Sequence, residues 1–368
     1  MKQEKRTELP ERNLDVLRAA AVLAVVVFHL LWSRHHVATA WVGRVGVLAF
    51  FVHTALVLMA SIERGGQTGR WMLGFYIRRI CRIYPLALVT LALWLTLHIP
   101  TETILAGVTS SIPTFSSGAI VSNALLLENL FNVPDVVGVF WTLPLEVQMY
   151  ATLPFCYLVA RRSARAVLAL IAAAIVLALV WPTISEAPLG LWRLTTLVQF
   201  VPCFLCGVFA YAARREWPAL AVLPAWSFPL LVTAAAAAYA PVARTNLGAW
   251  RSAPMWGVCF VISLGVIAIR ELPASRISRL ARWIARYSYG FYLLHNLPIW
   301  IAFVLLAREP AALQWTVIVL GIPALAVLAY HLVEAPVIRI GSRVVARQLG
   351  RSLKVVRPEV APAIESLP

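Results

Sequence analysis

Long apolar runs dominate this sequence, and they constrain its fold more than any other feature. Each run approaches the roughly 20 residues that an α-helix needs to cross a bilayer. Ten such runs lie near 14–33, 45–62, 84–99, 139–160, 166–181, 194–213, 218–240, 252–269, 287–306 and 312–335. Hydrophobic residues make up 61% of the 368 residues and charged residues only 13%, which excludes a soluble fold. Because the runs are continuous and do not alternate, we predict an all-α polytopic membrane protein with about ten transmembrane helices.

Basic residues alternate from one connecting segment to the next. If the N-terminal side is inside, 25 of the 32 Lys and Arg residues lie in inner segments and six in outer segments. This asymmetry is typical of cytoplasmic loops, so both termini are predicted to be cytoplasmic. It also explains the net charge of +16 without nucleic-acid binding. We predict a cytoplasmic segment 1–13, a transmembrane domain 14–338 and a cytoplasmic tail 339–368, which begins as a basic surface helix and ends disordered.

The first apolar run contains ionisable side chains at a depth where each costs roughly 2.5–3.5 kcal/mol. Arg18 and His29 are eleven residues apart, about three helical turns, so they share one helix face about 16 Å apart. Asp15 lies three positions before Arg18, where the two side chains are placed to pair. An interfacial arginine anchor and a buried core histidine are the structural alternative to a functional pair.

Two further groups of polar residues lie in or beside later runs. Arg78, Arg79 and Arg82 fall within one helical turn, and guanidinium groups bind phosphate in a bidentate manner. By composition alone, an ordinary positive-inside run or contact with lipid headgroups is the favoured explanation of these arginines. Glu146 lies about two turns into an apolar run entered from outside, at a depth similar to that of His29. A carboxylate there is paired, protonated or catalytic, or it forms an interhelical hydrogen bond.

The C-terminal half adds a polar stripe. Tyr292 and His295 follow Ser288 at positions i+4 and i+7, on one stripe of a helix, and Glu334 ends the last run just before Pro336. We interpret Ser288 as a packing residue in preference to a nucleophile.

Two other segments have simpler interpretations. Cys203 and Cys206 form a CxxC pair inside an apolar run, which favours buried small residues over a redox or metal pair. No metal site is expected. The outer segment 100–138 contains no Lys or Arg, and its apolar middle at 120–130 is expected to dip into the membrane or pack on the bundle.

Taken in order, these segments resemble the acyltransferase-3 family of bacterial integral-membrane O-acyltransferases. The motifs that carry the resemblance are Arg18-x10-His29, Arg78-Arg79-x-x-Arg82-Ile83-Tyr84-Pro85, Trp141…Glu146…Gln148…Tyr150, Ser288-Tyr289…Tyr292-Leu293-Leu294-His295 and Glu334-x-Pro336. One segment departs from the family, which usually has Leu-Ser-Gly where this chain has His53-Thr54-Ala55. A close-packing glycine is therefore lost, and the additional His53 is placed to enter the site.

The resemblance implies transfer of an acyl group, commonly acetyl, from cytoplasmic acyl-CoA to a sugar hydroxyl. The acceptor sugar would belong to a cell-surface polysaccharide such as an exopolysaccharide or lipopolysaccharide, to a lipid-linked glycan or to a glycosylated metabolite. The resemblance also implies a multi-pass protein of the bacterial inner membrane, in contact with membrane lipid. It makes His29 the essential imidazole and Arg18 its partner, and it places Arg78, Arg79 and Arg82 near the CoA phosphates.

A mechanism consistent with this resemblance uses neutral His29 as a general base on the acceptor hydroxyl. Glu146 is predicted to orient that imidazole, and Tyr292 or His295 to line the CoA channel or to act as an oxyanion donor. The alternative is a transporter or flippase for a glycolipid or anionic solute, because intramembrane charges also line substrate paths. The sequence has no inverted repeat or matching broken helices that would support a transporter.

Overall fold

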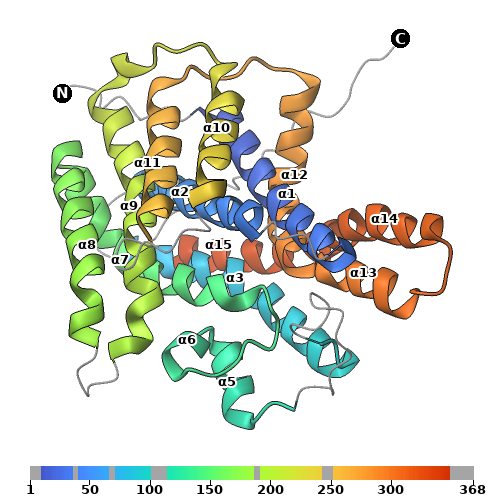
Figure 1. Ribbon diagram of the computed structural model, residues 1–368. Helices are drawn as coiled ribbons and strands as arrows, with labels where there is room; N and C mark the ends of the chain where they lie inside the picture. Colours follow the sequence, from blue (N-terminus) through green and yellow to red (C-terminus); the bar gives the residue numbers. More distant parts are fainter. Residues whose placement is uncertain are drawn as a thin grey trace.

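The computed structural model describes residues 10–35, 40–65, 71–100, 114–185, 191–242 and 252–348. Helices dominate this described part, which otherwise contains one isolated β-bridge between Leu223 and Ile269. The all-α fold is therefore confirmed. The longer helices are α1 (Glu11–His35), α2 (Ala40–Gly65), α3 (Trp71–Leu97), α7 (Leu143–Ala160), α8 (Ala164–Ser185), α9 (Thr195–Glu216), α10 (Ser227–Val242), α11 (Ala253–Ala268), α12 (Arg276–Leu294), α14 (Ala311–Ala329) and α15 (Ala335–Gln348) (Figure 1). The short helical elements are α5 (Ser117–Leu125), α6 (Glu128–Phe131), η1 (Phe140–Thr142), η2 (Leu191–Leu194), η3 (Pro218–Leu220), α13 (Asn296–Trp300), η5 (Ile301–Leu305) and η6 (Tyr330–Glu334).

Each predicted apolar run overlaps a helix or several helical elements, although the run 218–240 also contains a non-helical stretch at 221–226. By length and composition, however, six helices of the described residues are able to cross a membrane: α1, α2, α3, α8, α9 and the continuous helix from α14 into α15. A seventh span results if α12 and the helical segment after it, which are bent by 50°, are one span. Helices α10 and α11 have only 16 residues each. The structure thus supports a polytopic membrane protein with six to seven candidate spans, and the predicted number of ten is not confirmed.

Helix α2 lies at the centre of the bundle, between α1 and α9. Gly46 of α2 lies so close to α1 that an added Cβ would come within 2.5 Å of the Ala21 carbonyl oxygen. Gly207 of α9 approaches α2 even more closely, because an added Cβ would lie 2.2 Å from the Val52 oxygen and 2.8 Å from Ala55. The close-packing glycine that is missing at Ala55 is therefore matched by a glycine on the helix opposite it.

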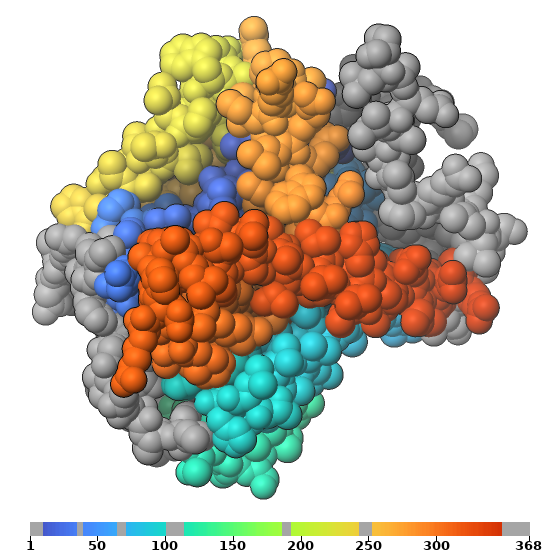
Figure 2. All heavy atoms as spheres, turned by 90° about the vertical axis from the view of Figure 1, so that its right-hand side faces the viewer, coloured from blue at the N-terminus to red at the C-terminus, as the bar shows by residue number. Residues whose placement is uncertain are grey.

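The C-terminal part of the chain forms a long arm. Helix α15 continues α14 through a π-helical turn, Tyr330–Glu334, and lies along α3, as the space-filling view also shows (Figure 2). The basic helix predicted after residue 339 is therefore present, but it begins at Ala335 and packs on α3. The predicted disordered end of the tail lies outside the described residues, as does most of the predicted segment 1–13.

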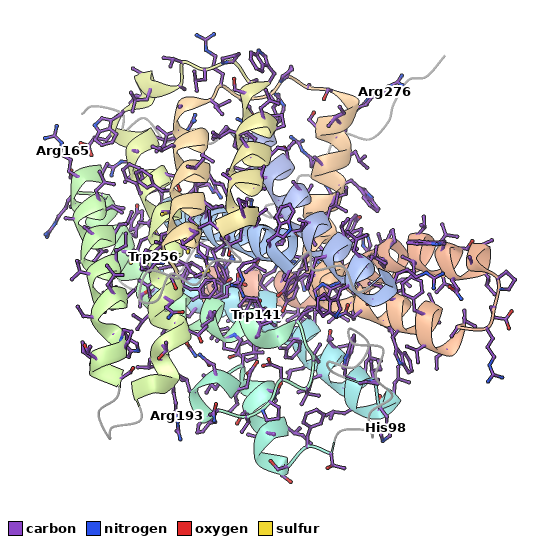
Figure 3. The ribbon with its side chains drawn as sticks, in the orientation of Figure 1. His98, Trp141, Arg165, Arg193, Trp256 and Arg276 are labelled. Atoms are coloured by element: carbon purple, nitrogen blue, oxygen red, sulfur yellow. The ribbon has the colours of Figure 1, made fainter. Side chains whose placement is uncertain are left out.

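The outer segment packs on the bundle. Helix α5 contacts α3, and α6 contacts η2. In Figure 3, Arg165 and Arg276 lie at one end of the molecule, and His98 and Arg193 lie at the opposite end. The charge pattern predicts this separation of inner and outer segments. The cytoplasmic location of the termini stays a prediction.

Candidate functional site

A cavity of about 100 Å³ lies among α1, α2, α3, α7 and α12. We call it the central cavity. Its polar lining includes Arg18, Arg79, Arg82, Glu146, Ser288 and Tyr292. Five of the predicted site residues, which come from four helices, therefore line the same cavity, although they are separated by up to 274 positions in the sequence. They are Arg18, Arg79, Arg82, Glu146 and Tyr292.

Two of the arginines are held in place by distant residues. The Nε of Arg18 donates a hydrogen bond to the Ser288 hydroxyl at 2.6 Å. Arg82 forms an ion pair with Glu334, whose side chain is 1% exposed. The Nε of Arg79 is also buried but has no hydrogen-bond partner. A buried donor without a partner is rare in folded proteins, and together with two fixed guanidinium groups it suits an anionic ligand such as phosphate.

Arg78 does not line the central cavity. On a helix with 100° per residue, Arg78 and Arg79 lie on opposite sides of Arg82, by about 40° and 60°. The face of the helix that carries Arg79 is turned toward the cavity. Of the three arginines predicted to form a cluster, only Arg79 and Arg82 therefore line the site.

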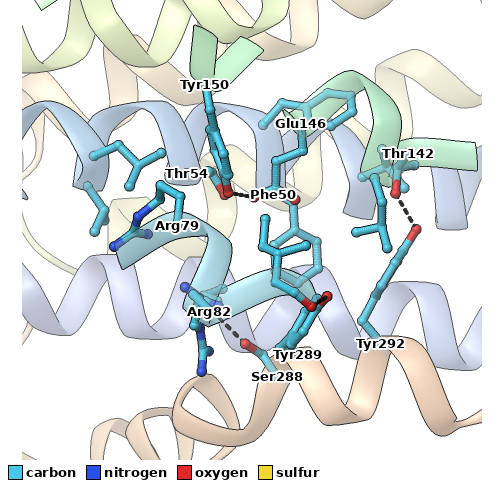
Figure 4. Close-up of a pocket in the computed structure, with 17 residues that line it drawn as sticks. Phe50, Thr54, Arg79, Arg82, Thr142, Glu146, Tyr150, Ser288, Tyr289 and Tyr292 are labelled. Atoms are coloured by element: carbon cyan, nitrogen blue, oxygen red, sulfur yellow. Dashed lines mark hydrogen bonds between the residues drawn. The ribbon is translucent and has the colours of Figure 1, made fainter. Parts of the chain in front are cut away.

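Glu146 is directed toward the arginines and not toward His29. It accepts a hydrogen bond from the Tyr150 hydroxyl (Figure 4). It also lies within electrostatic range of Arg18, Arg79 and Arg82. Glu146 and His29 form no hydrogen bond, so the predicted orientation of His29 by Glu146 is not seen. The carboxylate instead balances part of the cavity's positive charge.

His29 pairs with His295 of the neighbouring helix. The centroids of the two rings are 4.7 Å apart. The Nδ1 of His29 lies 2.8 Å from the Val25 carbonyl oxygen, and the Nδ1 of His295 lies 2.9 Å from those of Phe291 and Tyr292. Since a carbonyl oxygen accepts only, each Nδ1 carries the proton and each Nε2 has a free lone pair. The buried Nε2 of His295 has no hydrogen-bond partner.

Tyr292 lies between the histidine pair and the central cavity. It lines the cavity, whereas neither His29 nor His295 does. Its hydroxyl lies 2.6 Å from that of Thr142 (Figure 4). It also donates to the Val139 carbonyl oxygen at 2.9 Å. Because His295 follows Tyr292 by three residues, at the C-terminal cap of α12 where the backbone is still in the α-helical region, the imidazole pair lies about one turn beyond the cavity wall.

Other polar residues differ from the sequence predictions in informative ways. Asp15 pairs with Arg282 of α12 at 3.2 Å, and the predicted pair with Arg18 does not form. His53 is buried but does not line the central cavity, whereas its neighbour Thr54 does. Ser288 does more than pack, because it holds Arg18.

The buried cysteines are simpler. Cys203 and Cys206 are free and at most 1% exposed, which confirms the interpretation of the CxxC pair as buried small residues. Within the described residues, no group of three or more His, Cys, Asp or Glu side chains is arranged to hold a metal ion.

Sequence reasoning missed several residues of this site. Tyr150 lies four positions after Glu146, which is a usable helical signal for their hydrogen bond. The pair of Arg82 and Glu334 spans 252 positions, so no local pattern indicates it.

Comparison with known proteins now assigns the class. Residues 11–332 match the family described as acyltransferase domain, so the chain is a multi-pass membrane acyltransferase. More particularly, it belongs to the acyltransferase-3 family. It is similar to Nodulation protein 10 of Rhizobium leguminosarum bv. viciae, with 24% identity over 376 residues that cover 92% of this chain and 96% of the relative. No solved structure matches this chain. The family match favours a transferase over the transporter or flippase alternative.

Proposed function

We propose that this protein transfers an acetyl group from cytoplasmic acyl-CoA to a sugar hydroxyl at the bacterial inner membrane. The acceptor belongs to a cell-surface polysaccharide, a lipid-linked glycan or a glycosylated metabolite. One observation carries the proposal: arginines from separate helices converge on a cavity in the bundle, about one helical turn from an imidazole pair with free Nε2 lone pairs.

The arginines support a phosphorylated donor. The nucleotide part of CoA carries phosphates that cannot enter hydrocarbon, so cationic side chains must hold it at the membrane boundary. Arg82 is fixed by Glu334, and Arg79 has a buried N–H without a partner. The rest of the wall includes apolar side chains such as Val47 and Leu58, which suit the uncharged arm that carries the thioester.

The imidazole pair supports base catalysis. In the proposed step, the acceptor oxygen attacks the thioester carbon, and the Nε2 of His29 takes the hydroxyl proton. The new C–O ester bond replaces the C–S bond, and the proton passes to the departing thiolate of CoA. The Val25 carbonyl oxygen fixes the His29 ring through Nδ1 and stabilises the imidazolium. General-base catalysis of this kind contributes typically about 10²–10⁴-fold.

Glu146 takes a different role in this proposal from the one that the sequence predicted. Glu146 lies among Arg18, Arg79 and Arg82 and accepts a hydrogen bond from Tyr150. Its negative charge therefore offsets part of the repulsion between the three guanidinium groups and holds them in position. The ring of His295 packs against the ring of His29 and so helps to hold the proposed base in place.

The test follows radiolabelled acetyl groups. Membranes that contain the protein are incubated with acetyl-labelled acetyl-CoA, and alkali-labile label is counted in the glycan fraction. We expect label with the wild-type protein and with His98→Asn, an exposed histidine whose left-handed backbone (φ 51°) asparagine tolerates. The label should be lost with His29→Asn in correctly inserted protein. Equal labelling by His29→Asn would refute the assignment of the base.

A further inference from the structure

A second cavity, of about 230 Å³, lies where α6 meets the start of α9 and the segment η1. We call it the outer pocket, because the charge pattern predicts that these segments face outward. Its lining includes Glu128, Asn129, Asn132, Asp135, Trp141 and Thr196. No Lys or Arg is among its described lining residues, in contrast to the central cavity.

Glu128 is the unusual member of this lining. Its side chain is 1% exposed, and neither carboxyl oxygen has a hydrogen-bond partner on another described residue. A buried carboxyl group without a partner loses its hydration with no compensation, so it is costly unless a ligand supplies hydrogen bonds. Burial, together with the nearby Asp135, raises the pKa of Glu128 to about 8. At neutral pH the group is therefore a carboxylic acid that both donates and accepts hydrogen bonds.

The segment that carries Glu128 is rigidly built. The buried amide of Asn123 donates to the Ala119 and Pro134 carbonyl oxygens and accepts from the Val136 N–H at 2.8 Å. Two hydrogen bonds join the amides of Asn129 and Gln148, which ties α6 to α7. The lining of the outer pocket is thus held in place before any ligand binds.

The chemistry of the outer pocket fits a sugar. Hydroxyl groups need partners that donate and accept, and carboxyl and amide side chains provide both. The indole of Trp141 offers a flat π face with negative charge, which attracts the weakly positive C–H face of a sugar ring. Without a basic side chain, this lining does not favour phosphate, so the outer pocket is poorly suited to the CoA nucleotide.

The outer pocket shares a wall with the central cavity. Trp141 lines the outer pocket, and the next two residues, Thr142 and Leu143, line the central cavity. The Tyr292 hydroxyl is hydrogen-bonded to Thr142 and to the Val139 carbonyl oxygen on either side of Trp141. A sugar held against Trp141 is therefore presented directly to the segment that borders the donor site.

We propose that the outer pocket is the acceptor subsite, which holds one uncharged sugar unit by hydrogen bonds from Glu128 and stacking on Trp141. This inference rests on the proposed function for its meaning, but it is tested by binding alone. The probes are the methyl glycosides of glucose, galactose, mannose and N-acetylglucosamine. Their binding to the purified full-length protein is measured by saturation-transfer NMR without acyl-CoA.

We expect at least one glycoside to bind the wild-type protein and the matched control Glu309→Gln, which changes an exposed carboxyl group. Glu128→Leu should weaken that binding at least about tenfold, the effect of losing a hydrogen bond to a group in a buried polar site. Trp141→Leu should weaken it by a similar factor, because it removes the aromatic face on which the sugar stacks. Size-exclusion chromatography shows whether each variant folds. If either variant fails to fold, Thr196→Val, a smaller change in the same lining, replaces it and should also weaken glycoside binding.

Two results would overturn the inference. The first is that no glycoside binds, or that binding is indifferent to the substitutions in the outer pocket. The second is Ca²⁺ binding that depends on Glu128 and excludes the glycosides, which would make the outer pocket a cation site. The binding assay contains no donor and is therefore independent of the labelling experiment. Sugar binding here, together with no transfer of label from acetyl-CoA in that experiment, would refute the proposed function and leave the outer pocket in place.

Discussion

The central cavity and the outer pocket lie on two sides of one short segment, yet their linings differ in charge and chemistry. The central cavity is lined by Arg18, Arg79 and Arg82 with a single carboxylate, Glu146. The outer pocket has carboxyl groups, amides and an indole, with no Lys or Arg in its described lining. A transferase must bind two unlike molecules next to each other, and in our proposal this contrast separates a phosphorylated donor from a hydroxylated acceptor within one bundle.

The largest expected effect is at the proposed base, which lies beyond the wall of the central cavity. His29→Asn should lower kcat by about 10²–10⁴-fold, because it removes the proposed general base. The KM for acyl-CoA and the affinity for glycosides should stay within about twofold of the wild-type values. A steady-state assay with labelled acetyl-CoA measures this, with His98→Asn as the control. A rise in the acyl-CoA KM with unchanged kcat would instead make His29 a binding residue.

Arg79→Gln should act on the donor alone. Loss of a charge-assisted hydrogen bond to a phosphate costs about 1.5–3 kcal/mol, so we expect the KM for acyl-CoA to rise about 10- to 100-fold. Glycoside binding should not change. Arg78→Gln is the matched control, because Arg78 precedes Arg79 but does not line the central cavity. Equal effects of the two substitutions would show that general surface charge, and not the cavity, attracts the donor.

Tyr292→Phe should affect both sites by a smaller amount. It removes two hydrogen bonds that fix the shared segment, each worth about 0.5–1.5 kcal/mol. We expect a several-fold rise in both the acyl-CoA KM and the glycoside dissociation constant. A change in only one of them would show that the two sites are independent.

The last prediction concerns the stability of the fold around the outer pocket, through pH and Glu128, and not binding or catalysis. Its pKa is raised in the folded protein from an ordinary 4.5 to about 8, and Asp135 and Tyr84 are titratable groups near it. Folding therefore takes up a proton between these values, so this group's contribution to stability falls as pH rises from about 4.5 to 8 and then levels off. The slope is at most about 1.4 kcal/mol per pH unit.

Thermal unfolding in detergent measures that contribution. Between pH 5 and 9, the Tm of the wild-type protein should fall relative to that of Glu128→Gln, whereas it should run parallel to that of Glu309→Gln. A constant difference between wild type and Glu128→Gln would show that Glu128 does not titrate in this range.

The helices were predictable because hydrophobicity is a local signal. The position of each apolar run follows from the local stretch of sequence alone. The eleven-residue spacing of Arg18 and His29 correctly predicts that the two side chains share one face of the helix. Arg18 contacts Ser288 of α12, and His29 contacts His295, which directly follows α12. The number of spans was harder, because α10 and α11 are apolar but have only 16 residues each.

The partners of the polar residues were mostly not predictable. A helical-turn rule pairs Asp15 with Arg18, but a competing partner from another helix, Arg282, takes the carboxylate. Glu146 was singled out by its depth, yet depth does not reveal which neighbour it faces. The outer pocket was missed because Glu128 begins α6, a helix of four residues in the long outer segment, where a charged residue is unremarkable until its burial is known.

The central claim is that the arginine-lined cavity holds the CoA phosphates and leads the acyl group toward Tyr292 and the histidine pair. A cryo-EM map of the full-length protein in nanodiscs with a non-hydrolysable acetyl-CoA analogue tests this most directly. We predict phosphate density against Arg79 and Arg82, with the acyl end next to Tyr292. Density for the nucleotide elsewhere on the protein, or an acyl end remote from His29, would contradict the account.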